Sequence, residues 1–169
     1  MTSVSPKIKP VVALEVDNAN VSKRSWLSRL KLDHFRNYHQ ADLAIHAGQL
    51  VILGDNGAGK TNLLEAVSLL APGRGMRRAK TEHLAYRASG FDTSYDIADN
   101  DDADRLDWAV AATLENEDGT VQIGTGVPPS AKQGNRIMRL EGVTVSQGDL
   151  GSRLAVSWLT PQMDGVFLD

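Results

Sequence analysis

A chain of 169 residues, 41% of them hydrophobic, is long enough for one domain with its own core or for part of a larger domain. A formal net charge of −3 gives no general attraction to nucleic acid, so any contact with DNA needs a local basic patch. The absence of cysteine excludes thiolate nucleophiles and zinc–thiolate sites, and no apolar run is long enough for a bilayer span or a signal peptide. A cytoplasmic protein without a membrane partner is expected.

The N-terminal part of the chain predicts a tail followed by strands. Residues 1–25 have no apolar period and are expected to form a disordered tail. Side chains alternate over 26–34 and again over 41–45, which predicts two strands. The continuous apolar run at 49–53, QLVIL, predicts a third strand that is buried on both faces.

A glycine-rich loop with the spacing G-x-x-x-x-G-K-[ST] follows QLVIL directly. Its residues are Gly54, Asp55, Asn56, Gly57, Ala58, Gly59, Lys60 and Thr61. Glycines let such a loop turn tightly and bring its backbone N–H groups to phosphate oxygens. A helix predicted over 61–70 would point its positive N-terminal end at the same phosphates.

This loop predicts binding of ATP and Mg²⁺. Lys60 would contact the β- and γ-phosphates, and the Thr61 hydroxyl would be a ligand of Mg²⁺. The alternative is a glycine-rich surface turn with a chance Lys-Thr pair. The buried strand predicted before the loop and the amphipathic helix predicted after it disfavour this alternative.

A basic segment and an acidic segment come after the helix. Residues 74–80 could neutralise DNA phosphates or form an ordinary solvated surface, and both interpretations stay open. The basic residues there are Arg74, Arg77, Arg78 and Lys80. A short helix is predicted at 81–86. Residues 91–107 contain seven aspartates, but their spacing lacks the pattern of a calcium-binding loop, so a solvated loop is expected.

The rest of the chain predicts strands. They are expected at 106–114, 121–124, 136–140, 143–145 and 154–159, with hairpin turns at 115–120 and 141–142. Trp108 and Trp158 lie on two of these strands and are expected in the core. One helix directly after a phosphate loop, together with many antiparallel strands, predicts a mixed α/β or α+β fold.

Four segments together resemble the RecF family of DNA replication and repair proteins, which are ABC-type ATPases related to the heads of SMC proteins. The segments are 27–38 (LSRLKLDHFRNY), 54–66 (GDNGAGKTNLLEA), 73–77 (GRGMR) and, in an alphaproteobacterial form, 156–164 (VSWLTPQMD). The Walker A motif is common to many P-loop ATPases, so the F-R-N-Y element (35–38) and the T-P-Q-M-D element (160–164), in matching order, make the resemblance specific. Residues 26–169 are accordingly expected to be the N-terminal lobe of an ABC-type ATPase head, with a β-rich antiparallel part.

The resemblance also implies a function and further site residues. Such a protein is expected to bind ATP, to form an ATP-dependent homodimer, and to work with recombination-mediator proteins in loading recombinase at single-stranded or gapped DNA during the SOS response. Arg36, Asn37 and Asn62 are expected near the nucleotide, with a plain surface turn as the alternative for the first two. Gln162 is expected to contact Mg²⁺ or water, with a strand-end cap as the alternative.

Two motifs of a complete head are not found in the sequence. Neither the signature motif nor a Walker B strand with its acidic pair occurs before Asp169, so the lobe is expected to be truncated and to bind ATP without hydrolysing it. No catalytic residue is predicted. Two other functions stay open: a small-molecule kinase or other NTPase, which would need helices where 106–145 predicts strands, and a non-functional remnant, which would expose 49–53 as an apolar edge.

Overall fold

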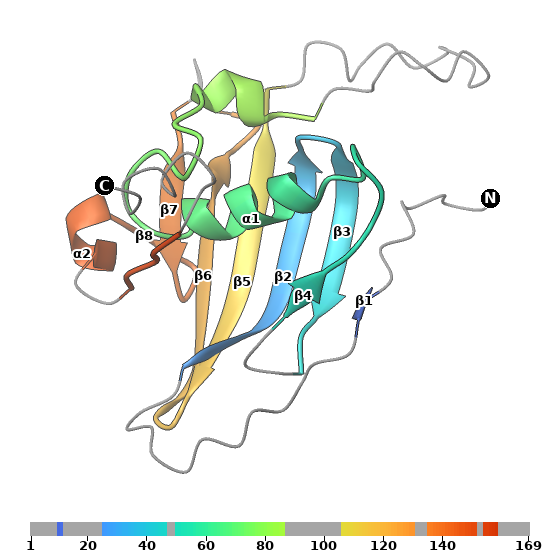
Figure 1. The fold of residues 1–169 in the computed structure, drawn as a ribbon. Coiled ribbons are helices and arrows are strands. Elements are labelled where there is room, and N and C mark those ends of the chain that lie inside the picture. Colours follow the sequence, from blue (N-terminus) through green and yellow to red (C-terminus); the bar gives the residue numbers. More distant parts are fainter. Residues whose placement is uncertain are drawn as a thin grey trace, which may run out of the picture.

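The computed structural model describes residues 10–11, 25–46, 50–86, 106–130, 135–151 and 154–158. In this part of the chain, helix α1 lies across one face of a six-stranded antiparallel sheet (Figure 1). The elements are β1 (Pro10–Val11), β2 (Trp26–Phe35), β3 (Tyr38–Ala44), β4 (Val51–Ile52), α1 (Lys60–Leu69), the 3₁₀ helix η1 (Thr81–Leu84), β5 (Trp108–Asn116), β6 (Gly119–Val127), β7 (Ile137–Leu140), β8 (Val143–Val145) and α2 (Gln147–Gly151).

The large sheet has the strand order β3-β2-β5-β6-β7-β8, and every neighbouring pair is antiparallel. Tight turns join three of the pairs. At the β7–β8 turn, Glu141 and Gly142 both have positive φ (51° and 78°), as the favoured two-residue hairpin turn requires. The hairpins predicted at 115–120 and 141–142 are therefore confirmed.

The core forms where alternate side chains of the sheet meet α1. Leu30 and Leu32 of β2 and Trp108 of β5 are buried, whereas Lys31 between the two leucines is exposed. Trp108 packs edge-on against Phe35, with ring centroids 5.6 Å apart, and its indole N–H donates to the Thr81 carbonyl at 3.1 Å. The prediction of Trp108 as a core residue is confirmed.

The C-terminal end of α1 is held by an arginine from outside the helix. Arg136, just before β7, donates hydrogen bonds to the carbonyl oxygens of Leu69, Ala71 and Gly73. These groups lie at or beyond the last turn of α1, where carbonyls lack partners within the helix. Through these hydrogen bonds Arg136 links the C-terminal end of α1 to the start of β7. Its burial lowers the pKa of the Arg136 guanidinium group.

The strand predicted at 49–53 is wrong in both its length and its burial. Over residues 50–53, which the structure describes, the strand is limited to β4 (Val51–Ile52), and it pairs with β1 (Pro10–Val11) rather than with the large sheet. Leu50, Val51 and Leu53 are 46%, 53% and 52% exposed, and we call these three residues the β4 edge. A continuous apolar run is compatible with a strand buried on both faces. Whether the strand is buried depends on the elements that pack against it.

The strand predicted at 154–159 is also wrong over the residues that the structure describes. Residues 154–158 form no strand, and the Leu154 N–H donates to the Leu150 carbonyl at 2.9 Å, which continues the helical bonding of α2. Trp158 is half-buried rather than part of the core. The middle of the acidic segment (91–105), Gln162 and, apart from β1, the expected tail lie outside the described residues. Among the described helices, none is both long enough and apolar enough to cross a membrane.

Candidate nucleotide-binding site

The backbone of residues 54–61 forms the turn that the glycine spacing predicts. Gly57 and Gly59 have φ of 88° and 101°, in the left-handed region that glycine adopts without a steric penalty. The Ala58 N–H donates to the Asp55 carbonyl at 3.1 Å, and the N–H groups of Asn62 and Leu63 donate to the Gly59 carbonyl to begin α1. The loop thus runs directly into the N-terminus of a helix, where free N–H groups and the helix dipole favour an anion.

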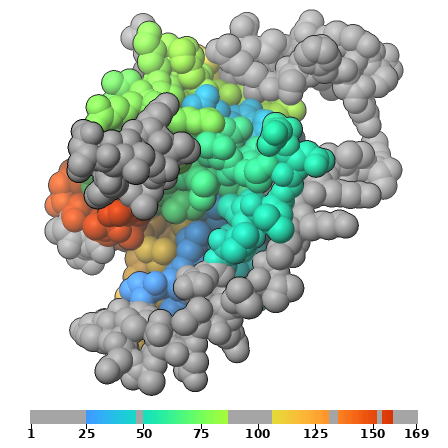
Figure 2. Space-filling view, in the orientation of Figure 1, coloured from blue at the N-terminus to red at the C-terminus, as the bar shows by residue number. Residues whose placement is uncertain are grey.

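Lys60 folds back over the loop that precedes it. Its ammonium group donates to the carbonyl oxygens of Gly54 at 2.6 Å and Asp55 at 2.8 Å. An ammonium group has three N–H donors, so this arrangement fixes the position of the charge at the mouth of the loop and leaves donor capacity for a ligand. Thr61 is exposed in the first turn of α1. Figure 2 shows the segment from β4 to α1, in teal and green, at the surface of the molecule.

Asn37, in the turn between β2 and β3, and Tyr38, the first residue of β3, pack against Gly59, and we call these two side chains the floor of the loop. A Cβ atom on Gly59 would lie 2.6 Å from both the Asn37 amide nitrogen and the Tyr38 hydroxyl oxygen, so only glycine fits. Tyr38 is 1% exposed, burial raises its pKa to about 12, and its hydroxyl has no hydrogen-bond partner among the described residues. The loop therefore rests directly on two polar side chains of the sheet.

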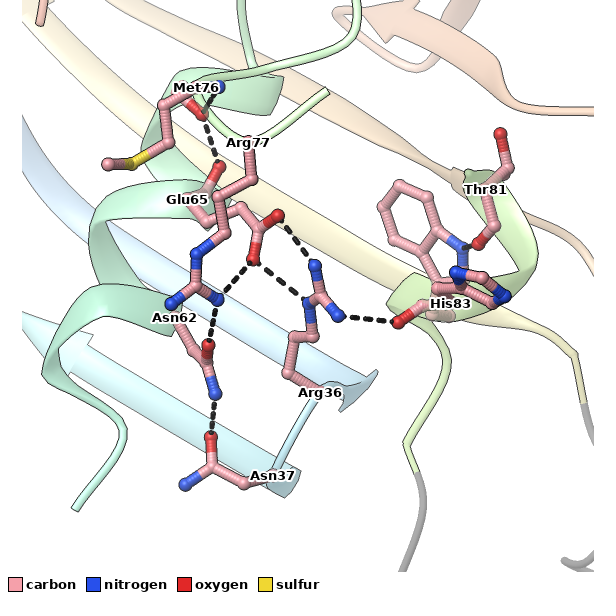
Figure 3. Close-up of polar contacts among 10 residues, drawn as sticks. Arg36, Asn37, Asn62, Glu65, Met76, Arg77, Thr81 and His83 are labelled. Atoms are coloured by element: carbon pink, nitrogen blue, oxygen red, sulfur yellow. Dashed lines mark hydrogen bonds and ion pairs between the residues drawn. The ribbon is translucent and has the colours of Figure 1, made fainter. Parts of the chain in front are cut away.

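A charged network joins this floor to α1 and to the basic segment (Figure 3). Arg36 donates two hydrogen bonds to the Glu65 carboxylate, at 2.9 and 2.7 Å, and a third to the His83 carbonyl at 2.8 Å. Arg77 donates to the same carboxylate at 3.3 Å. The side chain of Glu65 is only 2% exposed, and a buried carboxylate is strongly destabilising unless it is paired.

Asn62 continues this network towards the loop. Its carbonyl oxygen accepts from Arg77 at 2.9 Å, and its amide donates to the Asn37 side-chain oxygen at 2.7 Å. We call Arg36, Asn37, Asn62, Glu65 and Arg77 the supporting network. Its members come from three parts of the chain that the sheet and α1 bring together, and it ends beneath Gly59 of the phosphate-binding loop.

Residues 26–162 match the family described as the RecF/RecN/SMC N terminal domain. The chain belongs to this family. It is 45% identical over 144 residues to the DNA replication and repair protein RecF of Rhizobium johnstonii, and 46% identical over 145 residues to that of Rhizobium rhizogenes. These matches cover 83% and 84% of the chain but 34% of each relative, so the chain spans about a third of the length of these curated relatives. The predicted resemblance to RecF is confirmed.

Two solved RecF structures share the fold of this RecF/RecN/SMC family member. One, the recombination mediator protein RecF-ATP in the RecFOR pathway, has a TM-score of 0.62 at 20% identity and matches 88% of this chain and 36% of its own. The other, RecF-ATPrS, has a TM-score of 0.54 at 23% identity and matches 75% of this chain and 29% of its own. The predicted fold class, a mixed α/β lobe of an ABC-type ATPase head with an antiparallel sheet, is confirmed.

The structure gathers most of the site residues that the RecF/RecN/SMC resemblance implies. Asn37 lies directly beneath the loop, and Asn62 bridges Asn37 to Arg77. The guanidinium group of Arg36 bonds Glu65 of α1 and the His83 carbonyl, so this side chain binds protein groups. Arg36 and Asn37 form the turn between β2 and β3, where both are partly buried and both side chains bond to other parts of the chain. Gln162 lies outside the described residues.

Sequence reasoning missed Glu65, Tyr38 and the pairing of Arg77. Glu65 had a usable signal, because it stands in a helix whose neighbours at 63, 66 and 69 are apolar and buried. Acidic residues are almost never fully buried unless they are paired, so a carboxylate in a buried stripe indicates a cationic partner. No local signal identified that partner as Arg36, which lies 29 positions earlier.

Proposed function

We propose that this chain binds ATP with Mg²⁺ at residues 54–61, as part of a RecF-type protein of DNA replication and recombinational repair. The observation that carries the proposal is the shape of the loop: left-handed glycines, a lysine ammonium at its mouth and a helix N-terminus meet at one place. That combination suits a polyphosphate, because it supplies backbone donors and positive charge together. The ATP named in the solved RecF structures supports the same ligand.

Mg²⁺ fits the residues at the start of α1. The Thr61 hydroxyl is exposed in the first helical turn, one residue after the lysine that would contact the phosphates. In P-loop proteins the Ser or Thr hydroxyl after the lysine is a ligand of Mg²⁺ together with phosphate oxygens and waters, so the Thr61 hydroxyl is the first candidate ligand here. We place Thr61, with Gln162 as a second candidate, in the metal-binding role.

The wider role extends to DNA and to partner proteins. Arg74, Arg78 and Lys80 are exposed in the basic segment and would neutralise phosphates of single-stranded or gapped DNA. The replication and repair function named for the relatives, and the mediator role named for RecF, support a protein that helps to load recombinase. The proposal further includes an ATP-dependent homodimer in the cytoplasm. In this proposal, residues 26–169 form the N-terminal part of the ATPase domain.

The test of nucleotide binding is the affinity of the purified chain for a fluorescent ATP analogue in the presence of Mg²⁺. Lys60→Met should weaken binding at least tenfold, which corresponds to about 1.4 kcal/mol, because it removes the charge at the mouth of the loop. Lys80→Met, the same change at an exposed lysine outside the loop, should bind like the parent. Equal affinities for parent and Lys60→Met would contradict the proposal.

The test of DNA binding is its salt dependence. If the basic segment contacts DNA phosphates, removing one contact by Arg78→Gln should weaken binding to all sequences alike and reduce the slope of log affinity against log salt concentration by about 1. Fluorescence anisotropy with a labelled single strand, read at several salt concentrations, measures this slope. An unchanged slope in Arg74→Gln, Arg78→Gln and Lys80→Gln would place the DNA contact elsewhere.

A further inference from the structure

A buried carboxylate lies at the centre of the support beneath the phosphate-binding loop. Glu65 is 1% exposed, on the second turn of α1, and accepts hydrogen bonds from two guanidinium groups. Arg36 bonds both of its oxygens, in the bidentate geometry that fixes both distance and orientation. Glu65 therefore determines where Arg36, and with it the β2–β3 turn, can lie.

The backbone of that turn is held in an unfavourable conformation. Arg36 has φ of 57° and His34, two residues earlier, has φ of 47°, although neither is glycine. Non-glycine residues seldom adopt these angles unless the surrounding structure enforces them, and such positions cluster at binding and catalytic sites. Here the enforcing contacts are the Glu65 carboxylate and the carbonyls of His83 and Leu84, which accept from the Arg36 side chain and backbone N–H.

The constrained turn meets the loop through its next residue. Asn37 carries the amide that would lie 2.6 Å from a Cβ on Gly59, and its side-chain oxygen accepts from Asn62 at 2.7 Å. Arg77 links Glu65 to Asn37 by a second path, because one of its nitrogens donates to both Glu65 and Asn62, and Asn62 bonds Asn37. Two routes from Glu65 thus converge on Asn37 (Figure 3).

We propose that Glu65 is a positioning residue for nucleotide binding: it holds the Arg36–Asn37 turn in place, so that Asn37 supports Gly59 and keeps the N–H groups of the loop aimed at phosphate. The inference rests on the proposed function, because it concerns binding at that same loop. Glu65 acts through Asn37 and touches no nucleotide. Pre-organised donors bind a ligand more tightly than donors that must first be ordered.

The test is a double-mutant cycle on nucleotide affinity, carried out on the whole chain with the fluorescent ATP analogue and Mg²⁺. Glu65→Gln keeps the shape of the side chain but removes the charge that orients both guanidinium groups, and it should weaken binding at least tenfold. In a chain that already carries Asn37→Ala, the same substitution should have little further effect, because the path to the loop has been cut. Glu82→Gln, the same change at an exposed carboxylate, should leave affinity unchanged.

The outcomes separate this inference from the proposed function. No saturable binding by the parent would overturn both. Binding by the parent with equal affinity in Glu65→Gln would overturn only the role of Glu65. Losses that simply add in the double variant would also overturn it, because they would indicate a general effect on the fold rather than action through Asn37.

Arg77 provides a second route if Glu65→Gln does not fold. The Arg77 side chain is 42% exposed, so Arg77→Gln leaves less buried charge unpaired. It should weaken nucleotide binding about threefold to tenfold in the parent and should have no effect in the Asn37→Ala chain, with the near-UV circular dichroism of the tryptophans unchanged. An equal loss in both chains, or no loss in the parent, would overturn the inference.

Discussion

Two regions flank the phosphate-binding loop. In one the buried polar groups have bonding partners, and in the other the apolar side chains are left exposed to solvent. On one side, the supporting network pairs a buried carboxylate with two arginines, and one of these arginines is bonded in turn to an asparagine that bonds a second asparagine. On the other side, the three residues of the β4 edge are about half exposed. Strand β4 itself pairs only with β1 among the described residues. The loop itself is well formed between them.

The difference reflects the free-energy cost of leaving polar groups unpaired in the interior and of leaving apolar groups exposed at the surface. The supporting network is complete because polar groups in a protein interior must find partners within the same structure. Apolar groups at the surface carry a smaller penalty, so the β4 edge can stay exposed while the neighbouring core is closed. Substitutions near the supporting network should therefore be costly, and substitutions at the β4 edge should be cheap.

The largest effect on stability is expected at Gly59, where the phosphate-binding loop packs against Asn37 and Tyr38. Gly59→Ala would force a side chain into a left-handed backbone and against Asn37 and Tyr38, and should lower the free energy of unfolding by about 2–5 kcal/mol. Gly73→Ala is the matched control, because Gly73 has the same φ of 101° with nothing within 4 Å of the added Cβ. It should cost only about 1–2 kcal/mol. Equal losses by urea denaturation would show that the floor does not constrain Gly59.

A smaller effect is expected at the other end of α1. Arg136→Met keeps much of the side-chain volume but removes the donors to Leu69, Ala71 and Gly73, and should cost about 2–4 kcal/mol. Arg139→Met, at an exposed position on β7, is the control and should change stability by less than about 0.5 kcal/mol. Similar unfolding midpoints for the two variants would contradict the capping role of Arg136.

The smallest effect is expected at the β4 edge. Val51→Lys adds a charge to an exposed strand and should change the free energy of unfolding by less than about 0.5 kcal/mol while reducing self-association. Leu63→Ala, in the buried stripe of α1, should cost about 2–5 kcal/mol in the same assay. Denaturation and light scattering at several concentrations measure both quantities. A loss at Val51 as large as that at Leu63 would show that the edge is buried in solution.

The loop, its helix and the hairpins could be predicted from the sequence because their signals are local. The spacing of Gly54, Gly59 and Lys60 determines the turn, and the apolar positions after it determine the buried face of α1. The hairpins at 117–118 and 141–142 follow from the Asp-Gly and Glu-Gly turn signals, whose glycines, Gly119 and Gly142, both have positive φ.

The supporting network and the β4 edge could not be predicted, because both depend on neighbours that are distant in the sequence. Arg36 meets Glu65 only because the β2–β3 turn and α1 come together in the fold. QLVIL has the composition of a doubly buried strand, yet burial requires flanking elements that the local sequence does not specify. Residues 154–158 carry an apolar run as well, but Leu154 bonds back to Leu150 of α2 and no strand forms over 154–158.

The most direct test of ATP binding at residues 54–61 is equilibrium dialysis of labelled ATP against the purified chain, with Mg²⁺ and with Mg²⁺ removed by a chelator. We predict saturable binding of one ATP per chain that weakens when Mg²⁺ is removed and when Thr61 is changed to valine. The absence of saturable binding with Mg²⁺ present, in a chain that unfolds cooperatively, would contradict the assignment of residues 54–61 as an ATP-binding loop.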